Sequence, residues 1–309
     1  MTGPGASHHD GDGWVECAQG HRHWGRFGAA GLLLQRSARD GAAEVLLQHR
    51  AEWSHHGGTW GLLGGARHHD EPPVTTALRE AAEEAGLHAD AALVSGQYDD
   101  DHGGWSYSTV VAGEVGDAEA RPTSAETVEV RWWPVSSLPE LPLHPGFAQT
   151  WPVVRDALEP VTVVVDAANV VGSCPDGWWN DRAGAARRLI DDVTAVCSAG
   201  FADAALPGPL ARPPLQHWWP LAVVVVEGAA RSAADPVDGH WADERVRVLA
   251  APGAGDDAIV AAVAAAGDGP IVVVTADREL RGRCEALGAV AAGPRWLRGL
   301  IDVARGTSD

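Results

Sequence analysis

Short apolar or alternating stretches dominate the first half of the chain. Turns rich in glycine and aspartate separate them, which is typical of β-strands. One strong helix is predicted at about Thr75 to Gly86 and a closing helix over 144–158, so the mixture indicates an α+β arrangement. The predicted strands are GAAGLLLQR (28–36), AEVLLQHR (43–50), WSYSTVVAGEV (105–115) and VEVRWWPV (128–135).

The second half has a different pattern, in which compact apolar runs alternate with helical segments. Runs of this kind are buried on both faces, and their alternation with helices predicts a parallel sheet. The predicted strands are VTVVVD (161–166), LAVVVVE (221–227), VRVLAAP (246–252) and IVVVTAD (271–277). The predicted helices lie at about 181–197, 256–267, 278–288 and 294–304.

The change of pattern near Glu159 predicts two α/β domains, over 14–158 and 161–309, with a boundary at about 158–162. Between two predicted elements of the second domain, residues 200–220 are rich in proline and glycine and have no period. We expect an exposed loop or flap there.

Composition limits the partners and the compartment. The chain has 42 acidic and 23 basic residues, a net charge of −19, which argues against non-specific nucleic-acid binding through a basic face. The four cysteines are far apart and form no CxxC pair, which favours a reducing cytoplasm. No apolar run is long enough to span a membrane, and the first residues lack the apolar core of a signal peptide, so we expect a cytoplasmic protein with no membrane partner.

The segment CAQGHRH offers Cys17, His21 and His23 as zinc ligands. Two or three ligands do not close a tetrahedral site, and no second cluster follows along the chain. A surface turn entering a strand is therefore the preferred interpretation.

Three glutamates crowd one side of the predicted helix. Glu80, Glu83 and Glu84 are spaced i, i+3 and i+4, so their carboxylates share a stripe and repel one another. A solvated acidic face is one interpretation. The other is a divalent cation such as Mg²⁺, which prefers oxygen ligands and often bridges carboxylates to substrate phosphates.

The full spacing distinguishes these interpretations. Gly65 is followed after five residues by Glu71, and after seven more by the run REAAEEAGL, which begins at Arg79. This segment, 65–87, resembles the signature of the Nudix hydrolases, and we call it the signature segment. The resemblance extends over about 24–158 and implies that family's α/β/α sandwich with a mixed sheet.

The resemblance also implies an activity, which is metal-dependent hydrolysis of a pyrophosphate bond in a nucleoside diphosphate-linked substrate. It assigns Mg²⁺ or Mn²⁺ to Glu80, Glu83 and Glu84, and a supporting ion pair to Arg79 and Glu71. It gives Gly65 and Gly86 roles in the loop and at the helix end, and it is compatible with a homodimer. A further acid usually serves as base or extra ligand; the candidates are Glu126, which we prefer slightly, and Glu129.

Substrate contacts are less well defined by the sequence. Trp105 and Tyr107 alternate on a predicted strand, where they either stack on a base or pack in the protein. His55, His56 and Trp60 precede the signature segment and are candidates for contact with phosphate or base.

Acidic residues of the second half are predicted at the carboxyl ends of strands, where parallel sheets form their binding crevice. Asp166 and Asp277 end strands, and Asp256 and Asp257 open a helix. Converging carboxylates suit two-metal hydrolysis of phosphodiesters, whereas aspartates before helices are also ordinary caps.

Together with Asn169, Thr275 and Arg278, these aspartates resemble the NYN group of the PIN-like nucleases, and Glu227 falls where another acid sits. That resemblance covers about 161–309 and implies metal ligation by Asp166, Asp256, Asp257 and Asp277, with Asp166 and Asp277 catalytic. RNA is then the expected partner if this domain is a nuclease. The alternative is a module that binds nucleotide or RNA without cleavage and delivers substrate to the first domain.

Overall fold

The computed structural model describes residues 10–175, 177–208, 210, 213–234, 244–267 and 269–306. They form two compact units. The first unit contains residues up to Leu158 together with Pro213–Gln216, and the second contains Glu159–Arg212 and His217–Asp309. Among the described residues, no helix combines the length and the apolar character needed to cross a membrane.

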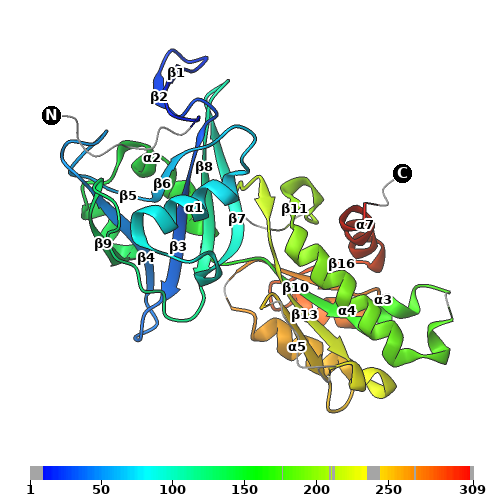
Figure 1. The fold of residues 1–309 in the computed structure, drawn as a ribbon. Coiled ribbons are helices and arrows are strands. Elements are labelled where there is room, and N and C mark those ends of the chain that lie inside the picture. The colour runs from blue at the N-terminus through cyan, green and yellow to red at the C-terminus, as the bar shows by residue number, and fades with distance from the viewer. Residues whose placement is uncertain are drawn as a thin grey trace. The chain divides into compact units, whose positions relative to one another are not determined.

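The first unit is built on a mixed sheet whose central strand is β3 (Ala29–Ser37) (Figure 1). β3 runs parallel to β8 (Ser106–Glu114) and antiparallel to β4 (Ala43–Arg50) and β6 (Leu63–Ala66). Its first six residues are buried, as expected for a strand covered on both faces. The remaining strands are β1 (Trp14–Glu16), β2 (Arg22–Trp24), β5 (Trp60–Gly61), β7 (Ala92–Asp101) and β9 (Thr127–Pro134).

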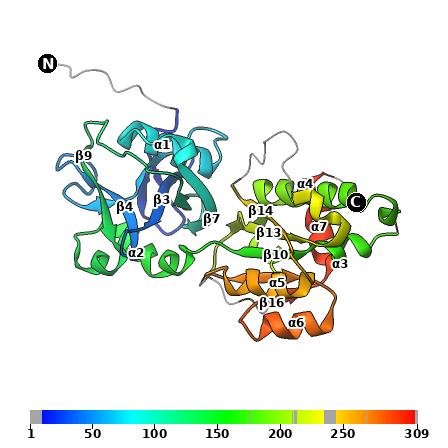
Figure 2. The same cartoon turned by 90° about the horizontal axis from the view of Figure 1, so that it is seen from below.

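Two helices cover this sheet on opposite faces, α1 (Pro73–Ala85) and α2 (Pro145–Val154) (Figure 2). Small buried residues such as Ala77 and Ala81 let α1 pack close to the strands. The helix ends at Gly86, whose φ of 67° is the left-handed conformation that glycine adopts without a Cβ penalty. The predicted helix at 75–86 therefore begins two residues later than α1 and ends one residue later.

The second unit has the predicted parallel sheet, in the order β14-β13-β10-β15-β16. Helices α4 and α7 cover one face and α5 and α6 the other (Figure 2). The strands are β10 (Thr162–Asp166), β13 (Leu221–Val226), β14 (Val246–Ala250), β15 (Ile271–Val274) and β16 (Val290–Ala292). The helices are α3 (Ala167–Gly172), α4 (Arg182–Ala199), α5 (Gly255–Ala264), α6 (Arg278–Glu285) and α7 (Pro294–Ala304).

The described part of the segment 200–220 differs from the expected exposed loop. It contains the short strands β11 (Phe201–Ala202) and β12 (His217–Trp218), which pair with each other. Leu206, Leu215 and Trp218 are buried. These buried apolar side chains are spaced irregularly among the prolines, so the sequence shows no period although the segment is partly buried.

Gly64 has no room for a side chain, because a Cβ there would collide with the backbone of Ala30 and Gly31 in β3. We expect Gly64→Ala to lower the free energy of unfolding by about 1–3 kcal/mol, the usual effect of overpacking. Gly113→Ala in β8 is the control, since its new methyl group would have Gln35 Nε2 at 3.6 Å as its nearest neighbour. Urea unfolding of both variants measures the difference, and equal stability of the two would contradict the packing argument.

Candidate functional site

Helix α1 presents its three glutamates to very different surroundings. The Glu84 residue is 7% exposed, and the Glu80 side chain is 15% exposed. The Glu83 side chain is 47% exposed and lies towards solvent. A solvated acidic face therefore accounts for Glu83 alone.

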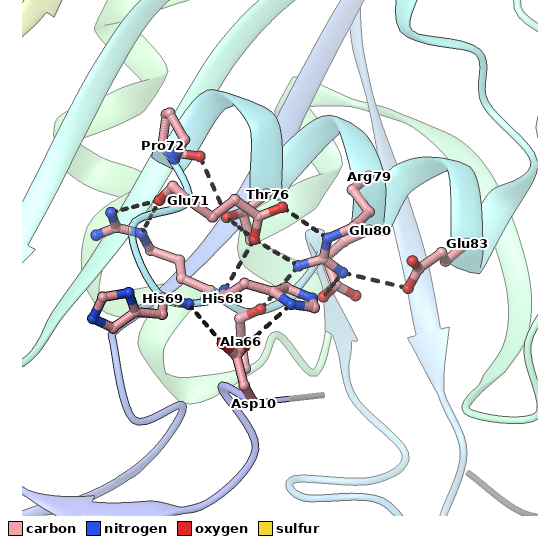
Figure 3. Close-up of polar contacts among 11 residues, drawn as sticks. Asp10, Ala66, His68, His69, Glu71, Pro72, Thr76, Arg79, Glu80 and Glu83 are labelled. Atoms are coloured by element: carbon pink, nitrogen blue, oxygen red, sulfur yellow. Dashed lines mark hydrogen bonds and ion pairs between the residues drawn. The ribbon is translucent and has the colours of Figure 1, made fainter. Parts of the chain in front are cut away.

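Arg79 links the loop before α1 to the glutamates (Figure 3). Its Nε and Nη2 atoms donate to the two carboxylate oxygens of Glu71 at 2.9 and 3.0 Å, a bidentate pair. Nη1 donates to Glu80 at 2.7 Å, and Nη2 also donates to the carbonyl of Ala66. Burial opposes ionisation of Glu71, but hydrogen bonds from Arg79, His68 and Thr76 outweigh it and lower the pKa of Glu71 to about 2. The predicted Arg79–Glu71 contact is therefore present.

Gly65 allows Glu80 to approach strand β6. A Cβ on Gly65 would lie 2.6 Å from the Glu80 carboxyl carbon, so any larger residue would displace this carboxylate. Gly64, one residue earlier, donates its backbone N–H to Glu84 at 2.8 Å. The two glycines thus bring β6 against the buried acids of α1.

Glu84 is held by a buried polar network. Gln48 Nε2 donates to the same carboxylate oxygen at 2.7 Å, and Gln48 Oε1 accepts from the Thr127 hydroxyl at 2.7 Å. Burial raises the pKa of Glu84 to about 8, with a further contribution from Glu80, although the hydrogen bonds from Gln48 and Gly64 act in the opposite direction. Gln48 and Thr127 were not predicted as site residues from the sequence. They lie 36 and 43 residues from Glu84, and no local spacing connects them to it.

The buried acids fit a divalent metal ion. Glu80 and Glu84 offer oxygen ligands, and among the described residues no arginine or histidine forms an ion pair with Glu84. A buried carboxylate without a cationic partner is strongly disfavoured unless a cation or a proton neutralises it. The oxygen donors suit Mg²⁺ or Mn²⁺.

A cavity of about 380 Å³ opens beside the signature segment. Gly64 and Gly65 line it, together with Arg50, Tyr107 and Phe147. Its volume is in the range of small-molecule sites, and its aromatic side chains provide an apolar surface for a planar ring. Arg50 supplies positive charge at the wall.

The aromatic residues considered for substrate contact have different positions. Trp105 and Tyr107 both line the cavity, but one face of Trp105 stacks on His23 at 4.0 Å between ring centroids. His55 and His56 also line it, whereas Trp60 is buried in the core and stacks on His49. His23 therefore covers one ring face of Trp105, and His102 makes a further T-shaped contact with this ring.

His144 joins His55 and His56, and their ligand atoms lie within 4.8 Å of one another. Burial, with smaller contributions from His56, Arg50 and His55, lowers the pKa of His144 to about 4. Its Nδ1 accepts the N–H of Gly146 at the start of α2. The His144 ring therefore serves as a neutral acceptor at neutral pH.

Neither of the two candidate base residues contacts the buried glutamates. Glu126 is exposed, and its backbone carbonyl accepts from Ala51 N. Glu129 pairs with Arg131 at 3.4 Å. Both lie on or beside β9, and Glu126 directly precedes the buried Thr127.

In the second unit, Asp166 joins the carboxyl ends of β10 and β15. Its Oδ1 accepts from Asn169 N at 3.0 Å and its Oδ2 from the Thr275 hydroxyl at 2.9 Å. Asn169 Oδ1 in turn accepts from Ala276 N. Burial raises the pKa of Asp166 despite these hydrogen bonds, and the charges of neighbouring acids add to the rise.

The other acids of this unit have individual partners. Asp277 caps α6 by accepting from Glu279 N and Leu280 N, and Asp257 pairs with Arg283. Glu227 accepts from Gly255 N at 2.8 Å. Burial raises the pKa of Asp256, and the charge of Asp277 adds to the rise. The cap interpretation thus describes Asp277 correctly, without excluding a second role.

The compact groups of potential metal ligands among the described residues contain neither the glutamates of α1 nor the acids of the second unit. Within the described ranges, the groups of three or more whose ligand atoms lie within 4.8 Å of one another are centred on histidines. One is the group at His144, and the other joins His102 to Cys17, His21 and His23. The glutamates of α1 and the acids of the second unit form no such group among these residues.

Known proteins of one family are similar in sequence to the first unit. A family model for the NUDIX domain matches residues 26–156. A Mycobacterium tuberculosis protein named "Putative 8-oxo-dGTP diphosphatase 3" is 44% identical over 214 residues, which cover 66% of this chain and 91% of that protein. Because 66% is more than the first unit spans, this similarity continues beyond Leu158.

Two further proteins are similar over about half of the chain. A nucleoside triphosphate pyrophosphatase/Nudix hydrolase fusion protein of Bifidobacterium longum is 43% identical over 151 residues, or 47% of this chain and 31% of the fusion protein. The crystal structure of a Nudix hydrolase from M. smegmatis, RenU, is 45% identical with a TM-score of 0.45, and the match covers 48% of this chain and 94% of that one.

The contribution of the Glu71–Arg79 ion pair to the stability of the fold can be measured. We expect Glu71→Gln to lower the free energy of unfolding by about 3 kcal/mol at pH 7, because the folded-state pKa of about 2 lies below the ordinary value of 4.5. A carboxyl with a depressed pKa stabilises the fold above its unfolded pKa, and this contribution is lost as the pH falls from 4.5 towards 2. Urea unfolding at pH 7 and pH ~3.5 measures it.

Glu83→Gln is the matched control, since Glu83 also contacts Arg79, at 3.4 Å, but is half exposed. Glu83→Gln should lower the free energy of unfolding by less than about 1 kcal/mol. Equal losses for the two variants, or a loss for Glu71→Gln that does not change with pH, would show that the bidentate pair is not the stabilising contact.

Proposed function

The chain belongs to the Nudix family of hydrolases, which act on phosphoric anhydrides, and we propose that it cleaves a nucleoside diphosphate-linked substrate in the cavity beside α1. The observation that carries this proposal is Glu84, a buried carboxylate that Gln48 and Gly64 hold in place without a positively charged partner among the described residues. Such a group is costly for stability, and its hydrogen bond from Gly64, which lines the cavity, favours a functional role.

Nudix hydrolases generally use divalent metal ions, and we assign this ion to Glu80, Glu83 and Glu84. A bound Mg²⁺ or Mn²⁺ supplies charge neutralisation for the phosphates and a water of lowered pKa. The protein contributes the positions of the ligands. Arg79, which is held by Glu71, donates to Glu80 and orients its carboxylate. The backbone N–H of Gly64 orients Glu84 in the same way.

Other cavity residues would bind and orient the substrate. Arg50 is placed to neutralise phosphate charge, and its Nε is held by the carbonyl of His55 at 3.1 Å. Phe147 and Trp105, which both line the cavity, offer aromatic surfaces for a base. Holding both ends of the substrate fixes the phosphates relative to the acids of α1.

We favour an oxidised purine nucleoside triphosphate as the substrate. The support is the name of the M. tuberculosis relative and the similarity to it, which continues into the second unit. We also assign the role of base or extra ligand to Glu126, because it adjoins Thr127 in the network that reaches Glu84 through Gln48.

Glu84→Gln tests the proposal. The glutamine keeps an acceptor for Gln48 and Gly64 but removes the charge, so kcat should fall by at least about 100-fold, the scale of losing one preorganised electrostatic group. The melting temperature without added metal should change little, because a pKa of about 8 already leaves Glu84 largely protonated, and glutamine is neutral and of similar shape. Product analysis with Mg²⁺ on 8-oxo-dGTP, dGTP, ADP-ribose and a dinucleotide polyphosphate measures activity, beside the exposed control Glu119→Gln.

Activity of Glu84→Gln within about tenfold of the parent would remove Glu84 from the metal site. Absence of cleavage of every compound by the parent would contradict the hydrolase proposal itself. Preference for ADP-ribose or the dinucleotide would replace the assigned substrate class but keep the reaction.

For the second unit we propose a PIN/NYN-like domain that cleaves RNA, with a non-catalytic module that binds nucleotide or RNA as the alternative. The supporting observation is the joint position of Asp166, Asn169 and Thr275 at the carboxyl ends of two parallel strands. Asp256 and Glu227 lie close enough to raise the pKa of Asp166 further. We assign metal ligation there to Asp166, Asp256, Asp257 and Asp277.

The full chain carrying Glu84→Gln, incubated with single-stranded RNA and Mg²⁺ or Mn²⁺, separates these alternatives. Cleavage should be lost in Asp166→Asn and kept in Asp181→Asn. Both aspartates cap a helix, Asp166 through Asn169 N and Asp181 through Gly184 N, and asparagine caps equally well. Saturable RNA binding without cleavage would favour the binding module, and neither binding nor cleavage would contradict both.

A further inference from the structure

We propose that Cys17, His21, His23 and His102 bind a structural Zn²⁺ ion that joins the β1–β2 hairpin to the turn between β7 and β8. One ligand atom from each of these residues lies within 4.8 Å of the other three. Ligand atoms in a tetrahedral zinc site lie about 3.4–3.6 Å apart, so side-chain adjustments of about an ångström complete the geometry. This site does not depend on the proposed hydrolase activity.

The backbone brings the ligands together from two distant segments. Glu16 pairs with Arg22, and Cys17 N donates to the carbonyl of His21, so Cys17 and His21 occupy the turn of the hairpin. Ala18 N donates to the carbonyl of Gly103 at 2.8 Å, which fixes this turn against the β7–β8 turn next to His102.

Two imidazoles have a buried nitrogen that lacks a partner. Among the described residues, His23 Nε2 and His102 Nδ1 accept and donate no hydrogen bond. The other nitrogen of His102 lies 3.2 Å from Asp100 Oδ2. Metal-bound histidines almost always place their second nitrogen on a carboxylate or carbonyl in this way, which orients the ring. The unpartnered nitrogens are therefore accounted for by a metal.

The surrounding contacts hold the rings in place. Trp105 stacks on His23 with an interplanar angle of 10° and donates its Nε1–H to the carbonyl of Gly25.

The donor set selects zinc over the ions suited to α1. One thiolate and three imidazoles are nitrogen and sulfur ligands, which Zn²⁺ prefers, whereas Mg²⁺ takes oxygen. Four protein ligands leave no open position, which is the arrangement of structural rather than catalytic zinc.

The hairpin has few other contacts to stabilise it. β1 and β2 pair only with each other within the described strands, and their side chains are exposed or half-buried. An isolated two-stranded hairpin is marginally stable in water. Because His21, His23 and His102 also line the cavity, zinc would fix one of its walls.

Metal analysis of the untagged full chain, purified under reducing conditions and dialysed, tests the proposal. We expect about one zinc per chain, bound through four protein ligands. Cys17→Ser and His102→Ala should lose most of it. His88→Ala, at an exposed histidine outside the group, and Glu84→Gln should keep it. Asp100→Asn should weaken zinc binding about 10–100-fold, because it changes only the residue behind His102.

Substitution with Co²⁺ identifies the ligands independently. The proposed site should give the intense visible bands of tetrahedral Co²⁺ and a thiolate charge-transfer band that Cys17→Ser abolishes. Substoichiometric zinc with no thiolate band in the parent would overturn the proposal. So would zinc that persists in both Cys17→Ser and His102→Ala, or that disappears in Glu84→Gln.

Discussion

Burial of carboxylates on α1 is the constraint on which the first unit depends. Glu84 is removed from water although no cation pairs with it among the described residues, and this raises its pKa to about 8. The fold compensates with neutral donors, from Gln48 on β4 and Gly64 on β6. Arg79 stabilises Glu71 and Glu80 but donates nothing to Glu84. Strands β4 and β6 thus fix the position of the Glu84 carboxyl group, and no described residue forms an ion pair with it.

Sequence periodicity predicted the elements that bury long apolar runs. AEVLLQHR coincides with β4, and the run 161–166 with β10 except for one residue. The parallel sheet of the second unit is confirmed for the same reason, since each of its main strands is buried over most of its length. The expected turn that enters a strand at CAQGHRH is present before β2. Its partner β1 was missed because it buries too little to show a pattern, and β7 because a bulge after Val94 interrupts its alternation.

The candidate site was predictable only where its residues are close in sequence. The helical spacing placed Glu80, Glu83 and Glu84 on one stripe, and the Arg79–Glu71 contact spans eight residues. Gln48 reaches Glu84 across 36 residues and His102 reaches the Cys17 turn across 85, and no local rule connects such positions. The same long-range packing places His23 against Trp105 and so covers one face of that ring.

The first unit contains two kinds of potential metal ligand, and this difference bears on which metal each would bind. Zinc binds most protein sites more tightly than magnesium, so a site of carboxylates alone does not exclude it. The group of Cys17, His21, His23 and His102, whose histidines line the cavity, is the better zinc site, because it combines a thiolate with neutral imidazoles. A filled, four-coordinate zinc there would also leave no position at which phosphate oxygens could bind. Under the two proposals, the oxygen ligands on α1 would bind the catalytic metal, and the nitrogen and sulfur ligands of the Cys17 group would bind the structural one.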